Sequence, residues 1–333
     1  MNRFALGVLT LALLAAGAAS ANAAAPEGPR LAILIQKYGQ EMLMTGPLGE
    51  HPQQLIGSKQ AQSGGPPSWS AGGSRLAFAA HVPGDDDPVL GVADADGGHL
   101  RIYPHIPLEL GNAVMAPDGS SAAFARVRVR RTGKRVITVM ASIWSFDFGK
   151  GVARRLTPWQ GEFLMPSSYS PDGSTLAATG WDFRRYRAVA IDLRTGSTSL
   201  LAGNAREPMY SPDGSSFAFV RWKPWLPEGE LKEASNIGEL RLGQVGVTVG
   251  STSLVRMRGL ASGPSWDPSG QRLTFVNSLD ENPKDHGLED GNRVMSVNAD
   301  GTCLTKVFAN PDMAVLGAAW QPGSGREAGR IAC

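Results

Sequence analysis

The sequence lacks the features that define several large classes of protein. Beyond its first two dozen residues it contains no apolar run long enough to cross a membrane. Its two cysteines are too few for a small scaffold held together by disulfides. Positive charge is not in excess either, since 32 Lys and Arg face 30 Asp and Glu for a formal charge of +2. A membrane-spanning protein, a disulfide scaffold and a nucleic-acid-binding protein are therefore not expected.

The composition favours a folded chain rich in turns. Of the 333 residues 42% are apolar, which is enough to bury a substantial core. The 41 glycines and 23 prolines favour many tight turns over long helices.

The first 23 residues have the order of a secretory signal peptide. One cation, Arg3, precedes an apolar run over residues 4–16, and small residues follow up to Ala23. We expect cleavage after Ala23 and an exported protein, periplasmic or secreted, whose residues 24–333 form a single domain. No cysteine lies near the cleavage site, so a lipid anchor is not expected there.

One short pattern recurs six times along the chain. It places an aromatic or apolar residue before a Ser-Pro-Asp-Gly-Ser turn, and it is clearest over residues 208–219. The six copies can be aligned on one column, which is proline in all but the first copy, with steps of 41 to 56 residues: Ala71, Pro117, Pro171, Pro212, Pro268 and Pro322. Repetition at this period indicates a repeat architecture.

Each repeat reads as four short antiparallel strands. Pro-Asp-Gly is turn chemistry, and apolar residues alternate on both sides of it, so the unit is a hairpin. Two further strand-like runs follow in each repeat, for example 186–193 and 197–201. Six such units predict an all-β, six-bladed β-propeller. The aromatic residues before the turns are expected to pack between blades: Trp69, Tyr169, Tyr210, Trp266 and Trp320.

The two ends of the chain complete one blade. Residues 31–36, 41–45 and 52–56 read as the last three strands of a repeat, and residues 317–321 supply its first strand. Joining them closes the ring and removes its exposed edges.

These repeats resemble the WSPDG-type repeats of the TolB family over about residues 30–325. The resemblance implies a TolB-like propeller, here without the N-terminal α/β domain of TolB itself. Similar propellers also occur in dipeptidyl peptidases and in pectin-degrading lyases, so the resemblance does not by itself select a function.

The loops between the second and third strands all emerge on one face, and two of them are basic. The second blade carries Arg128, Arg130 and Arg131 in a protruding hairpin, and the third carries Arg184 and Arg185 beside aromatic residues. These residues favour an anionic partner, which could be an envelope or extracellular protein or an anionic polymer. The alternative is a solvated hairpin.

A third loop of the same face contains Trp222 and Trp225 in a stretch broken by proline. Such tryptophans could form a lid or a contact patch, or they could pack on a neighbouring blade.

Metal and catalytic signatures are weak. The acidic loops at 85–87 and 280–290 lack the EF-hand spacing, so we expect no cofactor and retain Ca²⁺ only as a minor alternative. The five histidines show no metal-binding spacing, and no Gly-x-Ser-x-Gly motif is present. Cys303 and Cys333 are expected to form a structural disulfide, because an exported protein favours pairing.

The sequence therefore predicts a non-catalytic binding or scaffolding propeller that acts through one loop face. The alternative is a polysaccharide lyase or hydrolase with its site in the central channel. A cluster of titratable residues with shifted pKa values at the channel mouth would favour the enzyme.

Overall fold

The structure is a computed structural model. It describes residues 30–38, 40–47, 52–57, 66–82, 87–132, 136–222, 237–247, 250–278, 293–310, 313–323 and 332–333. The predicted signal peptide lies outside the described residues.

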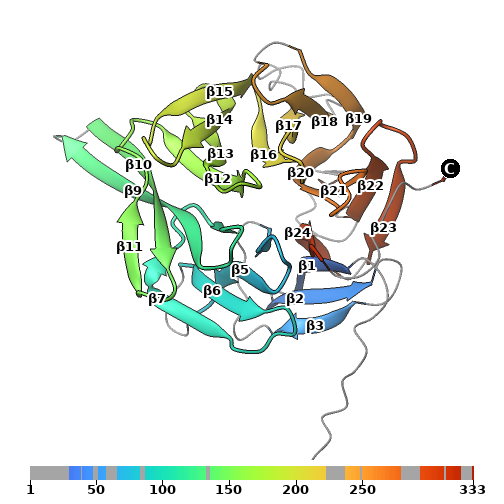
Figure 1. Ribbon diagram of the computed structural model, residues 1–333, viewed down its shortest axis with the longest axis horizontal. Helices are drawn as coiled ribbons and strands as arrows, with labels where there is room; N and C mark the ends of the chain where they lie inside the picture. The colour runs from blue at the N-terminus through green and yellow to red at the C-terminus, as the bar shows by residue number, and fades with distance from the viewer. Residues whose placement is uncertain are drawn as a thin grey trace, which may run out of the picture.

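The described residues form six four-stranded antiparallel sheets arranged as blades around a central channel, as Figure 1 shows. We number the blades from the first complete repeat. The first strand of each blade lies beside the channel and the fourth lies at the rim. The predicted six-bladed β-propeller is confirmed.

Three blades come from the first half of the ring. Blade one contains β4 (Ser68–Trp69), β5 (Arg75–Ala80), β6 (Val89–Asp94) and β7 (Arg101–Pro107). Blade two contains β8 (Ala113–Met115), β9 (Ser121–Thr132), β10 (Val136–Asp147) and β11 (Val152–Arg155). Blade three contains β12 (Phe163–Tyr169), β13 (Thr175–Trp181), β14 (Tyr186–Asp192) and β15 (Thr198–Gly203).

The other three blades complete the ring. Blade four contains β16 (Arg206–Tyr210), β17 (Ser216–Trp222), β18 (Ile237–Gln244) and β19 (Thr252–Arg258). Blade five contains β20 (Leu260–Trp266), β21 (Arg272–Ser278), β22 (Arg293–Asn298) and β23 (Thr305–Ala309). Blade six contains β24 (Ala314–Trp320), β1 (Arg30–Lys37), β2 (Gln40–Pro47) and β3 (Gln53–Ile56).

The two ends of the chain share blade six, as predicted. β24 pairs antiparallel with β1, with Leu31 opposite Trp320 and Gln36 opposite Ala314. The last strand of the sequence therefore closes the ring against the first.

The Pro-Asp-Gly turns end the first strands as the repeat pattern predicts. In blade three the Asp172 carboxylate accepts hydrogen bonds from the Ser170 hydroxyl and from the Ser174 backbone N–H and hydroxyl. These bonds lower the pKa of Asp172 to about 2. At the next turn Gly214 has φ 72°, and a Cβ there would lie 3.3 Å from Cδ of Pro171 in the preceding blade. The turns thus define the hairpins and also bring neighbouring blades into contact.

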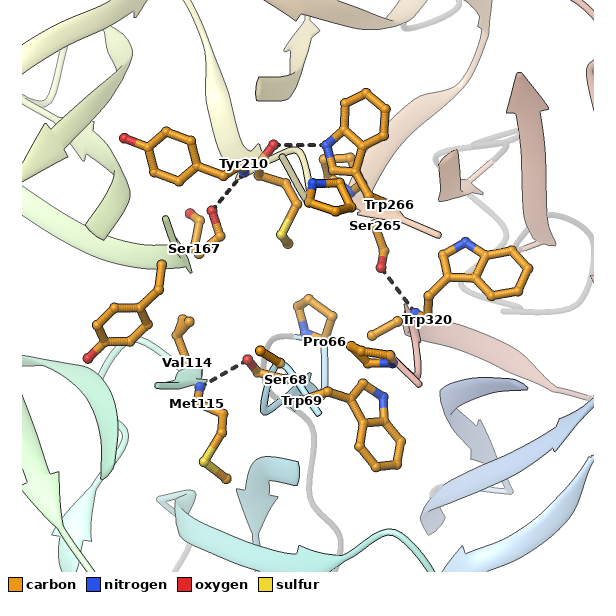
Figure 2. Close-up of a pocket in the computed structure, with 18 of the residues that line it drawn as sticks. Pro66, Ser68, Trp69, Val114, Met115, Ser167, Tyr210, Ser265, Trp266 and Trp320 are labelled. Atoms are coloured by element: carbon orange, nitrogen blue, oxygen red, sulfur yellow. Dashed lines mark hydrogen bonds between the residues drawn. The ribbon is translucent and has the colours of Figure 1, made fainter. Parts of the chain in front are cut away.

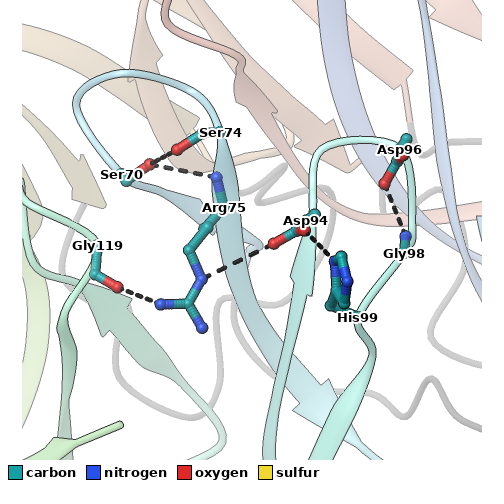
Figure 3. Close-up of polar contacts among 8 residues, drawn as sticks. All are labelled: Ser70, Ser74, Arg75, Asp94, Asp96, Gly98, His99 and Gly119. Atoms are coloured by element: carbon teal, nitrogen blue, oxygen red, sulfur yellow. Dashed lines mark hydrogen bonds and ion pairs between the residues drawn. The ribbon is translucent and has the colours of Figure 1, made fainter. Parts of the chain in front are cut away.

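Polar contacts at the turn face join blades one and two (Figure 3). Arg75 of β5 donates from Nη1 to the Gly119 carbonyl at 2.6 Å, and its Nε lies 3.9 Å from the Asp94 carboxylate. Asp94 in turn contacts the imidazole of His99 at 2.6 Å. One arginine therefore links its own blade to the turn of the next.

The aromatic residues before the turns belong to the core. Trp69, Tyr210, Trp266 and Trp320 are all less than a tenth exposed. The Trp266 indole donates from Nε1 to the Met209 carbonyl of blade four, so the ring spans the boundary between two blades. The packing role expected from the sequence is confirmed for these residues.

The predicted disulfide is present. Cys303 and Cys333 are bonded, with their Cα atoms 5.3 Å apart, and the bond ties the C-terminus to blade five. Among the described residues, no helix has the length and apolar character needed to span a membrane.

Candidate functional site

The β9–β10 hairpin of blade two carries arginines stacked on aromatic rings. Its end projects beyond the outline of the ring beside blade three (Figure 1). The Arg128 guanidinium lies 4.0 Å from the centre of the Trp159 ring, and that of Arg126 lies 4.8 Å from the Trp144 ring. These cation–π contacts hold the guanidinium groups against apolar surface. Arg128 is exposed, whereas the side chains of Arg130 and Arg131 lie outside the description.

An aromatic cluster lies beside this hairpin on blade three. Trp181 has its ring centre 5.3 Å from that of Phe163, 4.9 Å from that of Phe183 and 5.7 Å from that of Tyr186. Phe183 is 51% exposed and has φ 69°, a left-handed conformation that phenylalanine rarely adopts. An exposed ring held in an unfavourable backbone conformation is a feature of binding sites.

Two exposed arginines flank the cluster in the same loop. The Asp182 carboxylate accepts the backbone N–H groups of Arg184 at 2.9 Å and Arg185 at 2.8 Å, and these bonds lower the pKa of Asp182. The carboxylate therefore shapes the turn through the main chain. The carboxylate of Glu162 forms an ion pair with the guanidinium group of Arg187.

β12 packs against β9 and β10, so the two groups of residues form one region. We call it the cation–aromatic surface, made of Arg128, Trp159, Phe163, Trp181, Phe183, Arg184, Arg185 and Tyr186.

The structure describes only part of the other predicted loops. Trp222 is the last residue of β17 but its side chain is not described, and Trp225 lies outside the described residues. The acidic loop at 280–290 lies outside them too, as do Asp85 and Asp86. Within the described part of the chain no group of three or more His, Cys, Asp or Glu side chains could hold a metal ion.

The central channel contains a cavity of about 370 Å³. The first strands of all six blades line it, and Figure 2 shows these strands converging on it. Serines join neighbouring first strands: the Oγ atoms of Ser68, Ser168 and Ser265 accept the backbone N–H groups of Met115, Tyr210 and Trp320. Among the described residues that line the cavity there is no Lys, Arg or His.

One position per blade forms a ring at the end of the channel where the first strands begin. It lies five residues before the turn column, and its members are Pro66, Asn112, Pro166, Glu207, Gly263 and Gly317. Of these, Pro66, Asn112, Glu207 and Gly263 line the cavity. Neighbouring members touch: the Asn112 amide donates to the Pro166 carbonyl, and the Gly263 N–H donates to Glu207 Oε2. We call this set the mouth ring. Glu207 is its single charged member.

An irregularity in β16 determines the backbone conformation of Glu207. The register between β16 and β17 shifts between Arg206 and Met209, so Glu207 lies in a β-bulge with φ 52°. Its own N–H donates to Thr179 Oγ1 at 2.7 Å. Burial raises the pKa of the Glu207 carboxyl, opposed by the Gly263 hydrogen bond and by the charge of Arg206. Blades three and five have a register shift at the equivalent position, so the bulge belongs to the repeat, and the carboxylate is what distinguishes blade four.

No protein-family model matches this chain, and no curated protein matches it either. Solved structures do. The crystal structure of TolB from Acinetobacter baumannii aligns with a TM-score of 0.64 at 17% identity, over 88% of this chain and 66% of that one. The putative TolB from Agrobacterium tumefaciens aligns with a TM-score of 0.58 at 16% identity, over 88% of this chain and 99% of that one. The fold is that of a TolB-like β-propeller.

The coverage and identity of these alignments also limit what the structural similarity shows about this chain. This chain spans just under two thirds of the Acinetobacter TolB. A chain of the nidogen/laminin complex aligns with a TM-score of 0.61 at 11% identity, over 88% of this chain and 99% of that one. Because propellers from such different settings match equally well, the likeness establishes the fold alone.

In this TolB-like propeller, sequence reasoning found the basic loops but missed the mouth ring. The repeat alignment held the missing signal: five residues before each turn, four blades have Pro or Gly, and only Asn112 and Glu207 have polar side chains. A charged residue in a column of turn-forming residues has no role in building the repeat, and that contrast could have singled out Glu207.

Proposed function

We propose that this protein is an exported, non-catalytic binding propeller that contacts an anionic partner through its cation–aromatic surface. Residues 1–23 are its signal peptide and residues 24–333 its single domain. The disulfide between Cys303 and Cys333 supports export, because such bonds persist in oxidising compartments. The partner is an envelope or extracellular protein, or an anionic polymer.

The observation that carries the proposal is the partly exposed aromatic cluster beside exposed arginines. Arg128, Arg184 and Arg185 present positive charge to solvent, and the one carboxylate in their loop, Asp182, is bonded to the main chain. Aromatic faces combined with guanidinium groups bind ligands that offer both carboxylate or phosphate groups and apolar surface. Trp222, Trp225, Arg130 and Arg131 extend the proposed contact face, on the strength of their sequence positions.

The channel supports binding rather than hydrolysis. A glycoside hydrolase uses two carboxyl groups, one as acid and one as base or nucleophile. Of the two described acids that line the cavity, Asp267 accepts the Arg272 backbone N–H at 2.8 Å and the Ser269 hydroxyl at 2.5 Å. Among the described residues that line the cavity, Glu207 is thus the one acid not bonded in a turn, and burial raises its pKa.

Binding to polygalacturonate, an anionic polymer, provides the first test. The mature protein is expected to bind it with an affinity that falls steeply as salt rises, and to ignore neutral dextran. Replacing Arg128, Arg184 and Arg185 together by Ala should weaken binding about tenfold or more, since each lost charge-assisted contact is worth about 1 kcal/mol.

The control removes the same charge elsewhere. Arg154 and Arg155 of β11 and Arg194 in the turn after β14 are exposed and lie outside the cation–aromatic surface. Their triple Ala variant should bind as the parent does. Equal weakening by both triple variants would show that binding follows net charge alone and would overturn the assignment of this face.

A pull-down from the native envelope fraction tests the protein partner. A partner kept by the parent and lost when Arg128, Arg130, Arg131, Trp222 and Trp225 are all Ala would support the face. Equal retention by both would contradict it.

A further inference from the structure

We propose that the mouth of the channel is a second binding site, which takes an organic ammonium ion: Glu207 is the counter-ion, and the apolar part of the ligand enters the channel. This site differs from the cation–aromatic surface in place and in the sign of its charge. Its success or failure is therefore independent of the function proposed above.

The position of Glu207 shows that the fold does not require a carboxylate there. The equivalent residue of blade five, Gly263, has φ 57°, almost the same as the φ 52° of Glu207. Glycine adopts this conformation without strain, whereas glutamate does so at a cost. The remaining members of the mouth ring, apart from Asn112, are Pro or Gly. A strained acid among residues that merely shape the chain is typical of a functional position.

The electrostatics of the cavity favour a cation. Among the described residues, Glu207 and Asp267 are the acids that line it, and no basic side chain does. The Asp267 carboxylate is fully buried and used by neighbouring donors. Glu207 is bonded through one oxygen to the Gly263 N–H. Its nearest opposing charge, Arg206, stacks on Tyr186 at 4.1 Å on the blade-three side. A carboxylate desolvated by burial gains from an incoming cation.

Asn112 adds a second acceptor to the ring. Its amide nitrogen donates to the Pro166 carbonyl, but its Oδ1 atom is buried and has no hydrogen-bond partner among the described residues. Buried polar atoms are normally bonded, so an orphan acceptor in a cavity points to a missing donor. An ammonium group supplies up to three N–H donors, so the mouth offers it an amide oxygen on blade two as well as the carboxylate on blade four.

The walls below the ring favour a slender apolar body. Below the ring Val114 and Met209 line the cavity. The labelled Trp and Tyr rings and Met115 point away from the channel into the blades, as Figure 2 shows. Methionine side chains adapt to the shape of a ligand. A cavity of about 370 Å³ is at the small end of ligand sites, so it fits an alkyl or arylalkyl chain of a few carbons. The same chemistry occurs in a free amine, in a lysine side chain and in a peptide N-terminus.

Hexylammonium is the probe of choice, compared with 1-hexanol and heptanoate. All three carry a similar alkyl chain and differ in charge. Binding to the mature protein can be measured by calorimetry and by the shift of the ¹³C-methyl signal of Met209, which lines the cavity. Hexylammonium is expected to bind about tenfold or more tightly than hexanol, and heptanoate should not bind.

Variants at position 207 separate charge from structure. Glu207→Gln keeps an acceptor for the Gly263 N–H but removes the charge, and it should weaken hexylammonium binding about tenfold. Glu207→Asp keeps the charge and tolerates positive φ better, so it should retain part of the affinity. Glu109→Gln is the matched control: Glu109 is exposed and accepts the Val127 N–H at the same face, but it does not line the cavity.

The outcome is decided by these comparisons. Loss of binding in Glu207→Gln, with retention in Glu109→Gln and a shifted Met209 signal, supports the site. Unchanged affinity in Glu207→Gln, or no methyl shift up to about 20 mM hexylammonium, overturns it. Nα-acetyl-lysine methylamide and a leucyl dipeptide amide then distinguish a lysine side chain from a peptide N-terminus. If neither binds while hexylammonium does, the ligand is a free amine.

Discussion

At the scale of single residues, two of the six described non-glycine residues with a left-handed backbone conformation lie at the proposed sites. Phe183 has φ 69° on the cation–aromatic surface and Glu207 has φ 52° at the channel mouth. Such conformations cost about 1–3 kcal/mol each. Both residues lie where we propose that ligands bind, and neither is needed for the strand pairing of its blade.

The charge of Glu207 is expected to destabilise the folded protein at neutral pH. Glu207→Gln keeps the hydrogen bond from Gly263 and removes the buried charge, so it should raise the free energy of unfolding by about 1 kcal/mol at pH 7. A carboxyl whose folded pKa is raised binds its proton more tightly when folded. Its penalty is complete above the folded pKa and absent below the ordinary value.

Urea unfolding of parent and Glu207→Gln at about pH 7 and about pH 4 measures this effect. The two proteins should differ at the higher pH and converge at the lower one. A variant less stable than the parent at both pH values would show that the charge of Glu207 supports the fold, contrary to this prediction.

At the scale of strands, the six first strands alternate around the channel. Three residues before the turn column, blades one, three and five have Ser68, Ser168 and Ser265, and blades two, four and six have Val114, Met209 and Ala319. Each serine accepts the backbone N–H of a residue in the next blade. The ring is thus joined pairwise by serine hydroxyls.

The substitution Ser168→Ala tests the serine hydrogen bonds between neighbouring blades. The Ser168 hydroxyl is buried, accepts the Tyr210 N–H at 3.0 Å and donates to the Pro208 carbonyl at 3.1 Å. Its removal leaves two buried groups without a partner and should lower the free energy of unfolding by about 1–3 kcal/mol. Ser167→Ala is the control, because the neighbouring hydroxyl makes only a long contact of 3.5 Å with Met165. Equal effects of the two substitutions in chemical unfolding would contradict the role of the serine bridge.

The elements could be predicted from sequence because turn chemistry and alternation repeat in every blade. The predicted strand at 186–193 is β14 (Tyr186–Asp192), and the predicted closing strand at 317–321 is β24, which begins three residues earlier. The candidate site was harder to predict from the sequence than the strands. Arginine-rich loops are visible as composition, but the bulge that turns Glu207 toward the channel depends on strand register. Register within a repeat is a tertiary property, and a pattern of period two does not reveal it.

At the scale of the whole molecule, the ring carries opposite charges in two places and is closed at one seam. The cation–aromatic surface is basic and the channel is acidic. The seam is the pairing of β24 with β1, and the Cys303–Cys333 bond, whose cysteines are 30 positions apart, ties the C-terminus to blade five.

Cys333→Ser should therefore loosen the C-terminal end. Closing a loop of this length constrains the unfolded chain by about 3–4 kcal/mol in the chain-entropy account, so the variant should melt several degrees lower. Calorimetry under oxidising conditions measures the shift. A parent treated with reductant should melt at the temperature of the variant, and a variant that melts with the oxidised parent would contradict the prediction.

Because β24 closes the ring, the order of synthesis determines when the ring can form. A ribosome makes β1 long before β24, so a growing chain carries an unpaired edge on β1 until β24 has been added. The contact that completes the circle spans nearly the full length of the polypeptide, and contacts of such long range form slowly. The ring can therefore close only after β24 has been made, and a chain cut short before β24 keeps an unpaired strand edge that chaperones and proteases can recognise.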